Sequence, residues 1–259
     1  METLIVPETE AIGHGPFDPL IGYLHKQQST LSIYGAHMIH SLFKSGLGGK
    51  DIIWSQILPT AGGMVANQGQ LFAQCLDFYL SEEATLHLEE IQRLAKLDTK
   101  EADDLLLRYF MEGSRIRATV GLYRKSVTNI TIQDGMASID VKPGERLLCD
   151  LVAACQDRAT FPDPEQVKLD RPLDSYIHFG WGRHICLGMG ITKIALTTML
   201  KAVGKLENLR RAPGGQGQIK KIAGPGGITM YMTADHSSYF PFPTTMKIRW
   251  DGDFPKSRG

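Results

Sequence analysis

Apolar residues recur every three to four positions through most of the first 117 residues, the spacing of helices that bury one face. The pattern predicts a helix over residues 23–43, closed by a glycine-rich run. A longer helical stretch should begin at Asp51, whose carboxylate would cap it. Pro59 and the pair Gly62-Gly63 lie inside this stretch, where they should weaken or kink the helix. Such an interruption indicates either irregular packing or a place where the backbone makes room for a ligand.

Two more amphipathic helices are expected, one over residues 81–95 and one opened by a capping sequence at 98–101. Beyond them, short segments at 127–132 and 136–141 end in tight-turn residues and predict paired strands. Residues 157–183 are rich in Pro, Asp, Gly and Arg and have no period, which predicts a long ordered loop of the kind that is usually functional. The predicted fold class is therefore mainly α (α+β), with a small β-sheet between helices.

The ends of the chain show less regularity. Residues 1–20 predict a loose lead-in, and residues 21–259 predict one domain. A last helix should carry Ile191 and Ile194 on one face. From Leu206 onward the composition predicts loops rich in glycine and proline.

Composition and charge narrow the functional class. The chain has 259 residues, 42% of them apolar and 22% charged, the balance of a soluble globular protein. Twenty-eight basic residues offset 28 acidic ones, so no basic field exists to attract nucleic acid. No apolar run is long enough for a transmembrane segment, and the start lacks a secretory pattern, so an intracellular, cytoplasmic location is expected. The four cysteines form no Cys-x-x-Cys pair, which argues against a disulfide scaffold or a structural zinc site.

One cysteine stands in a chemically suggestive setting. Residues 179–188 read Phe-Gly-Trp-Gly-Arg-His-Ile-Cys-Leu-Gly and lead into a predicted helix. A thiol at such a junction meets free backbone N–H groups and the positive end of the helix dipole, which favour its thiolate. Flanking glycines allow a flat ligand to approach the backbone closely. A thiolate with an open face is a ligand for heme iron.

This segment resembles the signature of the heme-thiolate cytochrome P-450 superfamily. Its fixed positions are matched by Phe179, Gly182, His184, Cys186 and Gly188. The resemblance implies the C-terminal portion of the cytochrome P-450 fold, with heme b as cofactor and Cys186 as the axial ligand of its iron. It also implies that His184 contacts a heme propionate.

A second element of the same family is a Glu-x-x-Arg pair on an upstream helix. Glu112 and Arg115 have this form and share a helix face. Glu90 and Arg93 have it too, but Glu112 is preferred because the strand segments and the proline-rich loop lie between it and the cysteine. In that loop, Arg171 would be the partner of Glu112 and Arg115. The resemblance gives these three residues a structural role in holding the cysteine loop.

The interrupted helix should be the one that the family places over the oxygen side of the heme. Ordinary monooxygenases carry an acid next to a threonine there, to relay protons. Residues 61–70 contain no acid and present two neutral amides, Asn67 and Gln70, one helical turn apart. An amide can hydrogen-bond the oxygens of a peroxide but relays protons poorly. Asn67 and Gln70 are therefore the candidate catalytic residues, and they favour cleavage of a hydroperoxide over reduction of dioxygen.

Longer stretches resemble one subfamily, the C-terminal heme-thiolate domain of fungal linoleate diol synthases and psi-factor-producing fatty-acid oxygenases. They are residues 54–68, 96–99, 169–178 and 240–247, within a resemblance that runs from 22 to 251. In those fusions an N-terminal dioxygenase domain makes a fatty-acid hydroperoxide, which the C-terminal domain isomerises to a diol. The resemblance implies that residues 21–259 form part of such a domain, that a fatty-acid hydroperoxide is the substrate, and that the dioxygenase domain is a partner in the full-length family.

Three other functions stay open on the sequence. A reductase-dependent heme monooxygenase is disfavoured by the missing acid and threonine. An inactive truncated fragment without heme would keep the fold in part and survive as an interaction module. An isomerase that makes an allene oxide instead of a diol is also compatible with the residues around Asn67.

Overall fold

The computed structural model describes residues 30–117, 121–224, 229–233, 237–240 and 246–253. These divide into two compact units, one reaching to Asn67 and one beginning at Gln68. The lead-in expected over residues 1–20 and the start of the helix expected over residues 23–43 lie outside the described residues.

The first described element of this unit is helix α3, Thr30–Lys44, which agrees with the predicted helix over the residues that are described. Its end is closed by Gly46, which has a positive φ of 89° and donates its amide to Phe43 O at 2.9 Å. A left-handed glycine after the last turn is a common way to satisfy helix carbonyls. Helix α4 then spans Gly49–Ile52, so the expectation that Asp51 caps this stretch is wrong. Gly48 holds the cap position, and Asp51 lies within the first turn.

The predicted interruption takes the form of two π-helical turns. They are η1 (Ile53–Ile57) and η2 (Gly63–Asn67), with helix α5 (Leu58–Gly62) between them. Pro59 has no amide hydrogen to donate to a preceding turn, and a widened turn next to it removes the need for that bond. The second widened turn begins at Gly63. Glycine has no Cβ, so its backbone departs from the α-helical conformation more easily than that of other residues.

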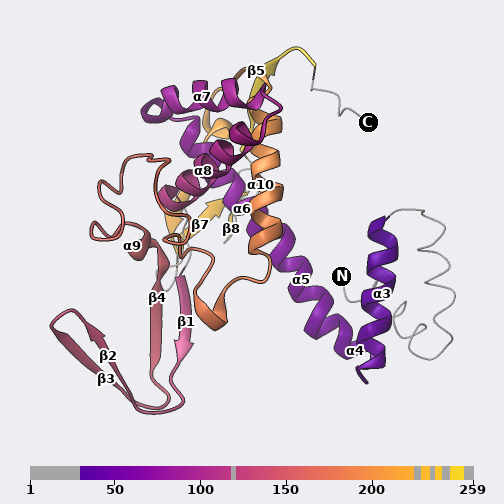
Figure 1. Cartoon of the computed structure of the whole chain (residues 1–259), viewed down its shortest axis with the longest axis vertical. Helices are drawn as coiled ribbons and strands as arrows, with labels where there is room; N and C mark the ends of the chain where they lie inside the picture. Colours follow the sequence, from indigo (N-terminus) through magenta and orange to yellow (C-terminus); the bar gives the residue numbers. More distant parts are fainter. Residues whose placement is uncertain (1–29, 118–120, 225–228, 234–236, 241–245, 254–259) are drawn as a thin grey trace. The chain divides into compact units, whose positions relative to one another are not determined.

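The core of the second unit is built from four helices. They are α6 (Gln68–Tyr79), α7 (Thr85–Ala95, after the short helix η3, Glu82–Ala84), α8 (Lys100–Arg117) and α10 (Met189–Gly204). Helix α8 packs against the other three and is the central element (Figure 1). Its buried residues include Leu106, Phe110 and Met111, none of which has exposed surface. The cap of α8 is Thr99, whose Oγ1 accepts the amide of Ala102 at 3.2 Å.

Two antiparallel pairs of strands follow α8. They are β1 (Gly121–Lys125) with β4 (Arg146–Asp150), and β2 (Ile130–Asp134) with β3 (Ala137–Val141). The β2–β3 hairpin confirms the predicted strands, with Gly135 at its turn and a φ of 59°. Strands β1 and β4 and the short helix α9, Leu151–Cys155, were not predicted. Figure 1 shows β1 and β4 side by side, with the β2–β3 hairpin continuing beyond them.

The tail after α10 contains strands, so the expectation of loops from Leu206 onward is wrong. The strands are β5 (Glu207–Arg211) paired with β9 (Ile248–Asp251), and β6 (Lys221–Ala223) paired with β7 (Thr229–Met232), which also pairs with β8 (Tyr239–Phe240). Each pair is antiparallel and short. Short strands between glycine and proline residues leave little alternation in the sequence, which is why the pattern did not reveal them.

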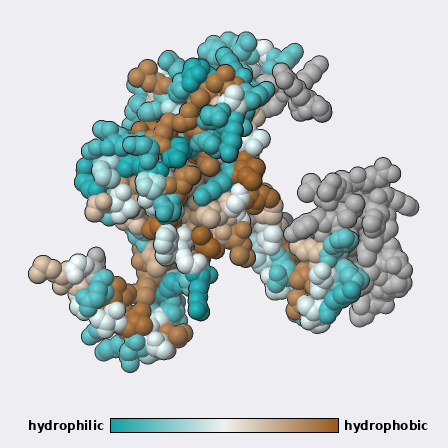
Figure 2. All heavy atoms as spheres, in the orientation of Figure 1, coloured by the Kyte–Doolittle hydropathy of each residue, from teal (hydrophilic) through white to brown (hydrophobic). Residues whose placement is uncertain are grey.

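The described elements are therefore mainly helical with small antiparallel sheets, which confirms the predicted α+β class. Apolar side chains are also exposed, among them Ile139 on the hairpin and Ile194 on α10. Figure 2 shows hydrophobic surface on the hairpin as well as on the helical part of this unit. None of the helices described is both long and apolar enough to cross a lipid bilayer.

Candidate functional site: the cysteine loop and the buried glutamate cluster

The segment between α9 and α10 is irregular, as predicted, apart from the short helix η4, Gly182–His184. Two glycines shape the end of this segment through positive φ angles, 82° at Gly180 and 57° at Gly182. A Cβ added to Gly180 would lie 2.5 Å from the backbone oxygen of His184, so the two backbone segments approach as closely as glycine alone permits. The result is a tight loop that reverses the chain just before α10.

Cys186 lies in this loop, three residues before the first residue of α10. Its amide donates to Phe179 O at 2.7 Å, and its carbonyl accepts the amide of Met189 at 3.1 Å. The backbone of Cys186 is therefore held on both sides, while its thiol is free and exposed. Gly188, the cap residue of α10, leaves room next to the sulfur, because a Cβ added there would lie 3.7 Å from Sγ.

Three large apolar side chains of this loop are exposed. Trp181 is 66% exposed, Ile185 42% and Leu187 103%, although large apolar side chains are usually buried. Phe179 is the exception, since its ring is buried and anchors the start of the loop. His184 is exposed on the same loop. The loop thus presents a free thiol within an apolar surface, with a basic side chain nearby.

Behind this loop lies a fully buried ion pair between Glu112 and Arg115 of α8. Arg115 Nε donates to Glu112 Oε1 at 2.8 Å, and a second nitrogen donates to Oε2 at 3.0 Å. Arg171 from the irregular segment adds its Nε at 3.3 Å from Oε2. The structure therefore brings together the three residues that the sequence singled out for a structural role.

The two arginines of this cluster also donate hydrogen bonds to the irregular segment and to the end of α9. Arg115 donates to the backbone oxygens of Cys155 and Pro164, at 3.0 and 2.7 Å. Arg171 donates to the backbone oxygens of Pro162 and Asp163, at 2.9 and 3.0 Å. A buried charge is tolerated only when its hydrogen bonds are satisfied, so the two arginines hold this loop in one conformation.

Tyr176 is a member of the cluster that the sequence did not reveal. Its hydroxyl donates to Glu112 Oε1 at 2.8 Å, and the residue is 6% exposed. Burial alone would raise the pKa of Glu112, but the bonds from Arg115, the Lys168 amide and Tyr176, with the charge of Arg115, outweigh it and lower the pKa. Burial and the adjacent carboxylate raise the pKa of Tyr176. Glu112 is therefore ionised and Tyr176 is a neutral donor at neutral pH.

The other Glu-x-x-Arg pair lies in a different environment. Glu90 and Arg93 on α7 form two hydrogen bonds of 2.7 Å, but their side chains are 37% and 59% exposed. An exposed pair of this spacing adds little to stability. The two pairs are alike in sequence and differ in burial, which is the property that separates a surface pair from a structural cluster.

The candidate amides lie on either side of the division between the two units. Asn67 is the last residue of η2 and is exposed, whereas Gln70 lies in α6 and is half-buried. Between them in sequence, Gln68 donates to Thr192 Oγ1 on α10 at 3.3 Å. The bond from Gln68 connects α6 to the first turn of the helix that follows the cysteine loop, a link that the sequence analysis did not identify.

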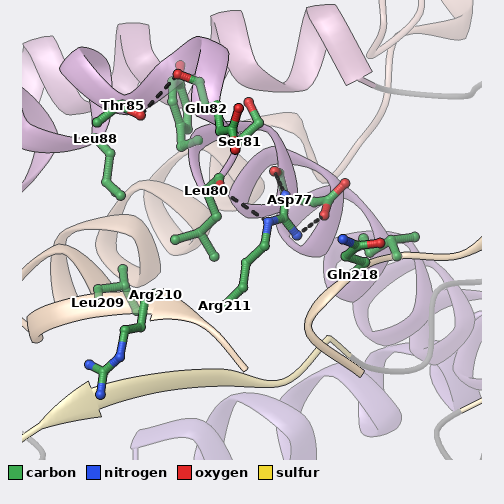
Figure 3. A pocket seen from close by; sticks show the side chains of 12 residues that line it. Asp77, Leu80, Ser81, Glu82, Thr85, Leu88, Leu209, Arg210, Arg211 and Gln218 are labelled. Atoms are coloured by element: carbon green, nitrogen blue, oxygen red, sulfur yellow. Dashed lines mark hydrogen bonds and ion pairs between the residues drawn. The ribbon is translucent and has the colours of Figure 1, made fainter. Parts of the chain in front are cut away.

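A cavity of about 660 Å³ lies elsewhere in the second unit, between the end of α6, α7 and β5 (Figure 3). It includes none of the residues of the cysteine loop. Arg211 on its wall donates to Leu80 O at 3.0 Å, to Asp77 and to Gly217 O at 2.8 Å. Because its donors are used in closing the end of α6, this arginine offers no cation for a ligand.

Residues 104–231 match the family model of cytochrome P-450. This match contains the Glu112 cluster, the irregular segment and the Cys186 loop. This part of the chain belongs to the cytochrome P-450 family. The substrate-free structure of CYP109E1 from Bacillus megaterium shares the fold, with a TM-score of 0.60 and 21% identity over 94% of this chain and 62% of that one.

Within this family the chain is similar to fungal fatty-acid oxygenases. It is 59% identical to psi-producing oxygenase A of Aspergillus fumigatus over 92% of this chain and 22% of that protein. It is 50% identical to a bifunctional dioxygenase and epoxy alcohol synthase of Fusarium oxysporum, over 87% of this chain and 18% of that protein. It is 38% identical to linoleate diol synthase of Gaeumannomyces graminis, over 86% and 22%. The chain thus spans about a fifth of the length of these relatives.

The residues of the cysteine loop fit a heme. An iron bound by a thiolate needs a sulfur that is free and reachable from outside, and Cys186 meets both conditions. A flat macrocycle also needs apolar surface in the loop that carries the sulfur, and the exposed side chains of Trp181, Ile185 and Leu187 supply it. By contrast, Cys75 and Cys155 are buried, and Cys149 is exposed but lies within strand β4 rather than in a glycine-rich loop.

Proposed function

We propose that this chain carries the heme-thiolate site of a fatty-acid hydroperoxide isomerase, with Cys186 as the axial ligand of heme b. The observation that carries the proposal is the free, exposed thiol of Cys186 in a loop whose backbone is hydrogen-bonded on both sides, just before α10. Heme, when bound, supplies the chemistry that cleaves a peroxide O–O bond and oxidises a nearby carbon. The similarity to psi-producing oxygenase A and linoleate diol synthase supports an unsaturated fatty-acid hydroperoxide as the substrate.

The residues of the chain have separate roles in this proposal. Phe179, Gly182 and Gly188 shape the cysteine loop, and His184 would bind a heme propionate. Cys186 would hold the iron through its thiolate. Glu112, Arg115 and Arg171 hold the loop from behind and do not touch the substrate.

Asn67 and Gln70 are proposed to hydrogen-bond the two peroxide oxygens. Their side-chain amides donate hydrogen bonds without releasing a proton, so they orient the O–O bond rather than relay protons to it. This role matches a substrate that already contains both oxygen atoms. It requires no reductase, and it assigns the making of the hydroperoxide to an N-terminal dioxygenase domain like that of the longer relatives. We also propose a cytoplasmic location, where the dioxygenase domain would pass its hydroperoxide to this site.

The first experiment is the absorption spectrum of the chain reconstituted with heme and reduced under carbon monoxide. A red-shifted Soret band typical of a thiolate ligand is expected. It should vanish in Cys186→Ala and persist in the matched control Cys149→Ala, which removes the other exposed thiol. A band that survives Cys186→Ala would refute the assignment, and a chain that binds no heme would identify it as an inactive fragment.

Turnover separates the isomerase from a monooxygenase. The heme-loaded chain should consume linoleic acid hydroperoxide without a reductant or a redox partner, and it should be inert toward linoleic acid itself. Asn67→Leu and Gln70→Leu should each slow this turnover by about 100-fold, the usual effect of removing a donor that stabilises developing charge, and leave the carbon monoxide band in place. Gln56→Leu, an exposed amide of η1, is the control and should change nothing. Turnover that needs dioxygen and a reductase would support the monooxygenase instead.

One relative favours a second product. The protein from Fusarium oxysporum is named for epoxy alcohol synthase activity and is 50% identical to this chain. An epoxy alcohol and a diol arise from the same hydroperoxide and differ in where the second oxygen is placed. Mass spectrometry of the product therefore tests the choice between a diol, an epoxy alcohol and an allene oxide.

A further inference from the structure

Four aromatic rings form a continuous series between the buried glutamate cluster and the cysteine loop. The centroids of Phe161 and Tyr176 are 5.7 Å apart, those of Tyr176 and His178 6.0 Å, and those of His178 and Phe179 4.5 Å. All four residues are buried. Contacts of this geometry are favourable and restrict the orientation of each ring. We call these four residues the aromatic series.

The series is anchored at its inner end. Phe161 lies beneath the guanidinium groups of Arg115 and Arg171, with their central carbons 5.1 and 5.6 Å from the centroid. Tyr176 adds the hydroxyl bond to Glu112. Because Glu112 is completely buried and is held by Arg115, it provides a fixed point for the phenol. The bond is charge-assisted, which makes it one of the stronger kinds of hydrogen bond.

At its outer end the series leads directly into the cysteine loop. Gly180 donates its amide to Ile177 O at 2.7 Å, and Cys186 donates its amide to Phe179 O at 2.7 Å. At one end of the stretch from Tyr176 to Phe179, the Tyr176 hydroxyl donates a hydrogen bond to Glu112. At the other end, the carbonyl of Phe179 accepts the amide of Cys186. We therefore expect a shift of Tyr176 to move Phe179 and the carbonyl that accepts the Cys186 amide.

We propose that Tyr176 is a positioning residue for Cys186, which couples the buried Glu112 cluster to the backbone hydrogen bond between Cys186 and Phe179. This inference rests on the proposed function only in taking the Cys186 loop as the heme-binding loop. The physical claim concerns the chain alone: the phenol restrains the opening of the loop, and the ring by itself does not. Tyr176 touches neither heme nor substrate in this role.

Hydrogen exchange of the Cys186 amide tests the claim in the full 259-residue chain without heme. Tyr176→Phe keeps the ring and removes the bond to Glu112. Loss of a charge-assisted bond should speed local opening, so exchange at Cys186 should rise by about tenfold or more. The amide of Ser126, which donates to Glu145 O in a turn outside the loop, should keep its wild-type rate.

The matched control is Tyr79→Phe. Tyr79 is also fully buried, and its hydroxyl donates to the backbone oxygen of Tyr109 in the contact between α6 and α8. This variant loses a buried phenol bond of the core but not the connection to the cysteine loop. It should leave the exchange rate of Cys186 unchanged once both variants are compared at equal global stability.

A second readout is the alkylation rate of Cys186 relative to Cys149, the other exposed thiol, measured by peptide mass spectrometry. The ratio should change in Tyr176→Phe and stay constant in Tyr79→Phe. Equal behaviour of the two variants in both measurements would overturn the proposal, as would an unprotected Cys186 amide in the wild-type chain. The proposed function is judged separately by the carbon monoxide spectrum, so one proposal can fail without the other.

Discussion

At the scale of single residues, burial determines what a Glu-x-x-Arg pair contributes. Glu112 has no exposed surface and accepts hydrogen bonds from Arg115, Arg171, Tyr176 and a backbone amide. A neutral replacement leaves two buried guanidinium groups without their carboxylate. Breaking a buried pair in this way typically costs about 3–5 kcal/mol, far more than an exposed pair contributes.

We therefore predict that Glu112→Gln lowers the free energy of unfolding by about 3–5 kcal/mol in urea denaturation. The same change at Glu90, which has the same spacing to its arginine but lies exposed on α7, should leave the midpoint nearly unchanged. Similar losses for the two variants would mean that the Glu112 cluster is not a buried unit.

His178 predicts a pH dependence of stability. Burial lowers the pKa of His178 to about 3, and the charges of Lys193 and Arg115 act in the same direction while Glu112 opposes them. The unfolded chain binds a proton at this histidine below about pH 6.5, whereas the folded chain stays neutral. The folded chain therefore has its full stability with respect to His178 above about pH 6.5. As the pH falls from there toward the folded-state pKa, the free energy of unfolding decreases by about 1.4 kcal/mol per pH unit.

His178→Leu should remove this slope. Urea midpoints measured between pH 5 and pH 7 should fall with decreasing pH in the wild type and stay nearly level in the variant. The two ring nitrogens of His178 lack a hydrogen-bond partner in the structure, so an apolar side chain of similar volume should also be tolerated at neutral pH. A slope that persists in the variant would assign the pH dependence to other groups.

The sequence identified Glu112, Arg115 and Arg171, because a family motif marks their positions, and the structure places them in one cluster. It did not identify Tyr176 or His178. The hydroxyl of Tyr176 reaches a carboxylate 64 positions away in the chain. Neither periodicity nor a motif records a contact over that separation, and only the fold brings the two residues together.

At the scale of elements, Arg211 closes the end of α6. The last carbonyl groups of a helix have no partner within the helix. Arg211 on β5 donates to the backbone oxygen of Asp77 in the last turn and to that of Leu80, the residue after the helix, and it also pairs with the Asp77 carboxylate (Figure 3). It also donates to Gly217 O, which connects the tail to the same point.

Arg211→Lys should therefore destabilise the chain even though it keeps the charge. An ammonium group cannot reproduce the planar fork, and leaving these partly buried carbonyls unpaired should cost about 1 kcal/mol, at the low end for an unsatisfied acceptor. Hydrogen exchange should accelerate in the last turn of α6 and in β5. Arg210→Lys is the control, because that neighbour is exposed and pairs with Asp251 at the surface. An equal loss of stability in the two variants would contradict the role of Arg211.

Long helices were predictable from the sequence, and short strands were not. Helices α7 and α8 carry enough turns for their apolar face to stand out, and the Asp134-Gly135 turn marks the β2–β3 hairpin. The strands of the tail have two to five residues each, too few for alternation to be recognised. Their positions are set by pairing with distant segments.

At the scale of the whole second unit, the sequence pattern of α10 does not determine which face of the helix is buried. The helix is apolar on more than one face, so periodicity alone does not say which face is inside. The structure buries Leu196 and Leu200 against the other helices and leaves Ile191 and Ile194 54% and 71% exposed. The two isoleucines that the sequence placed on one face therefore form part of the surface of this unit.

The two faces of α10 should respond oppositely to substitution. Leu196→Ala should lower the free energy of unfolding by about 2–5 kcal/mol, because it leaves a cavity among packed helices. Ile194→Gln should leave stability nearly unchanged and reduce self-association, since exposed apolar surface promotes it. Urea denaturation and sedimentation at increasing protein concentration measure the two effects. A large loss of stability in Ile194→Gln would show that this face is covered in the isolated chain, because a polar amide is costly only where water is excluded.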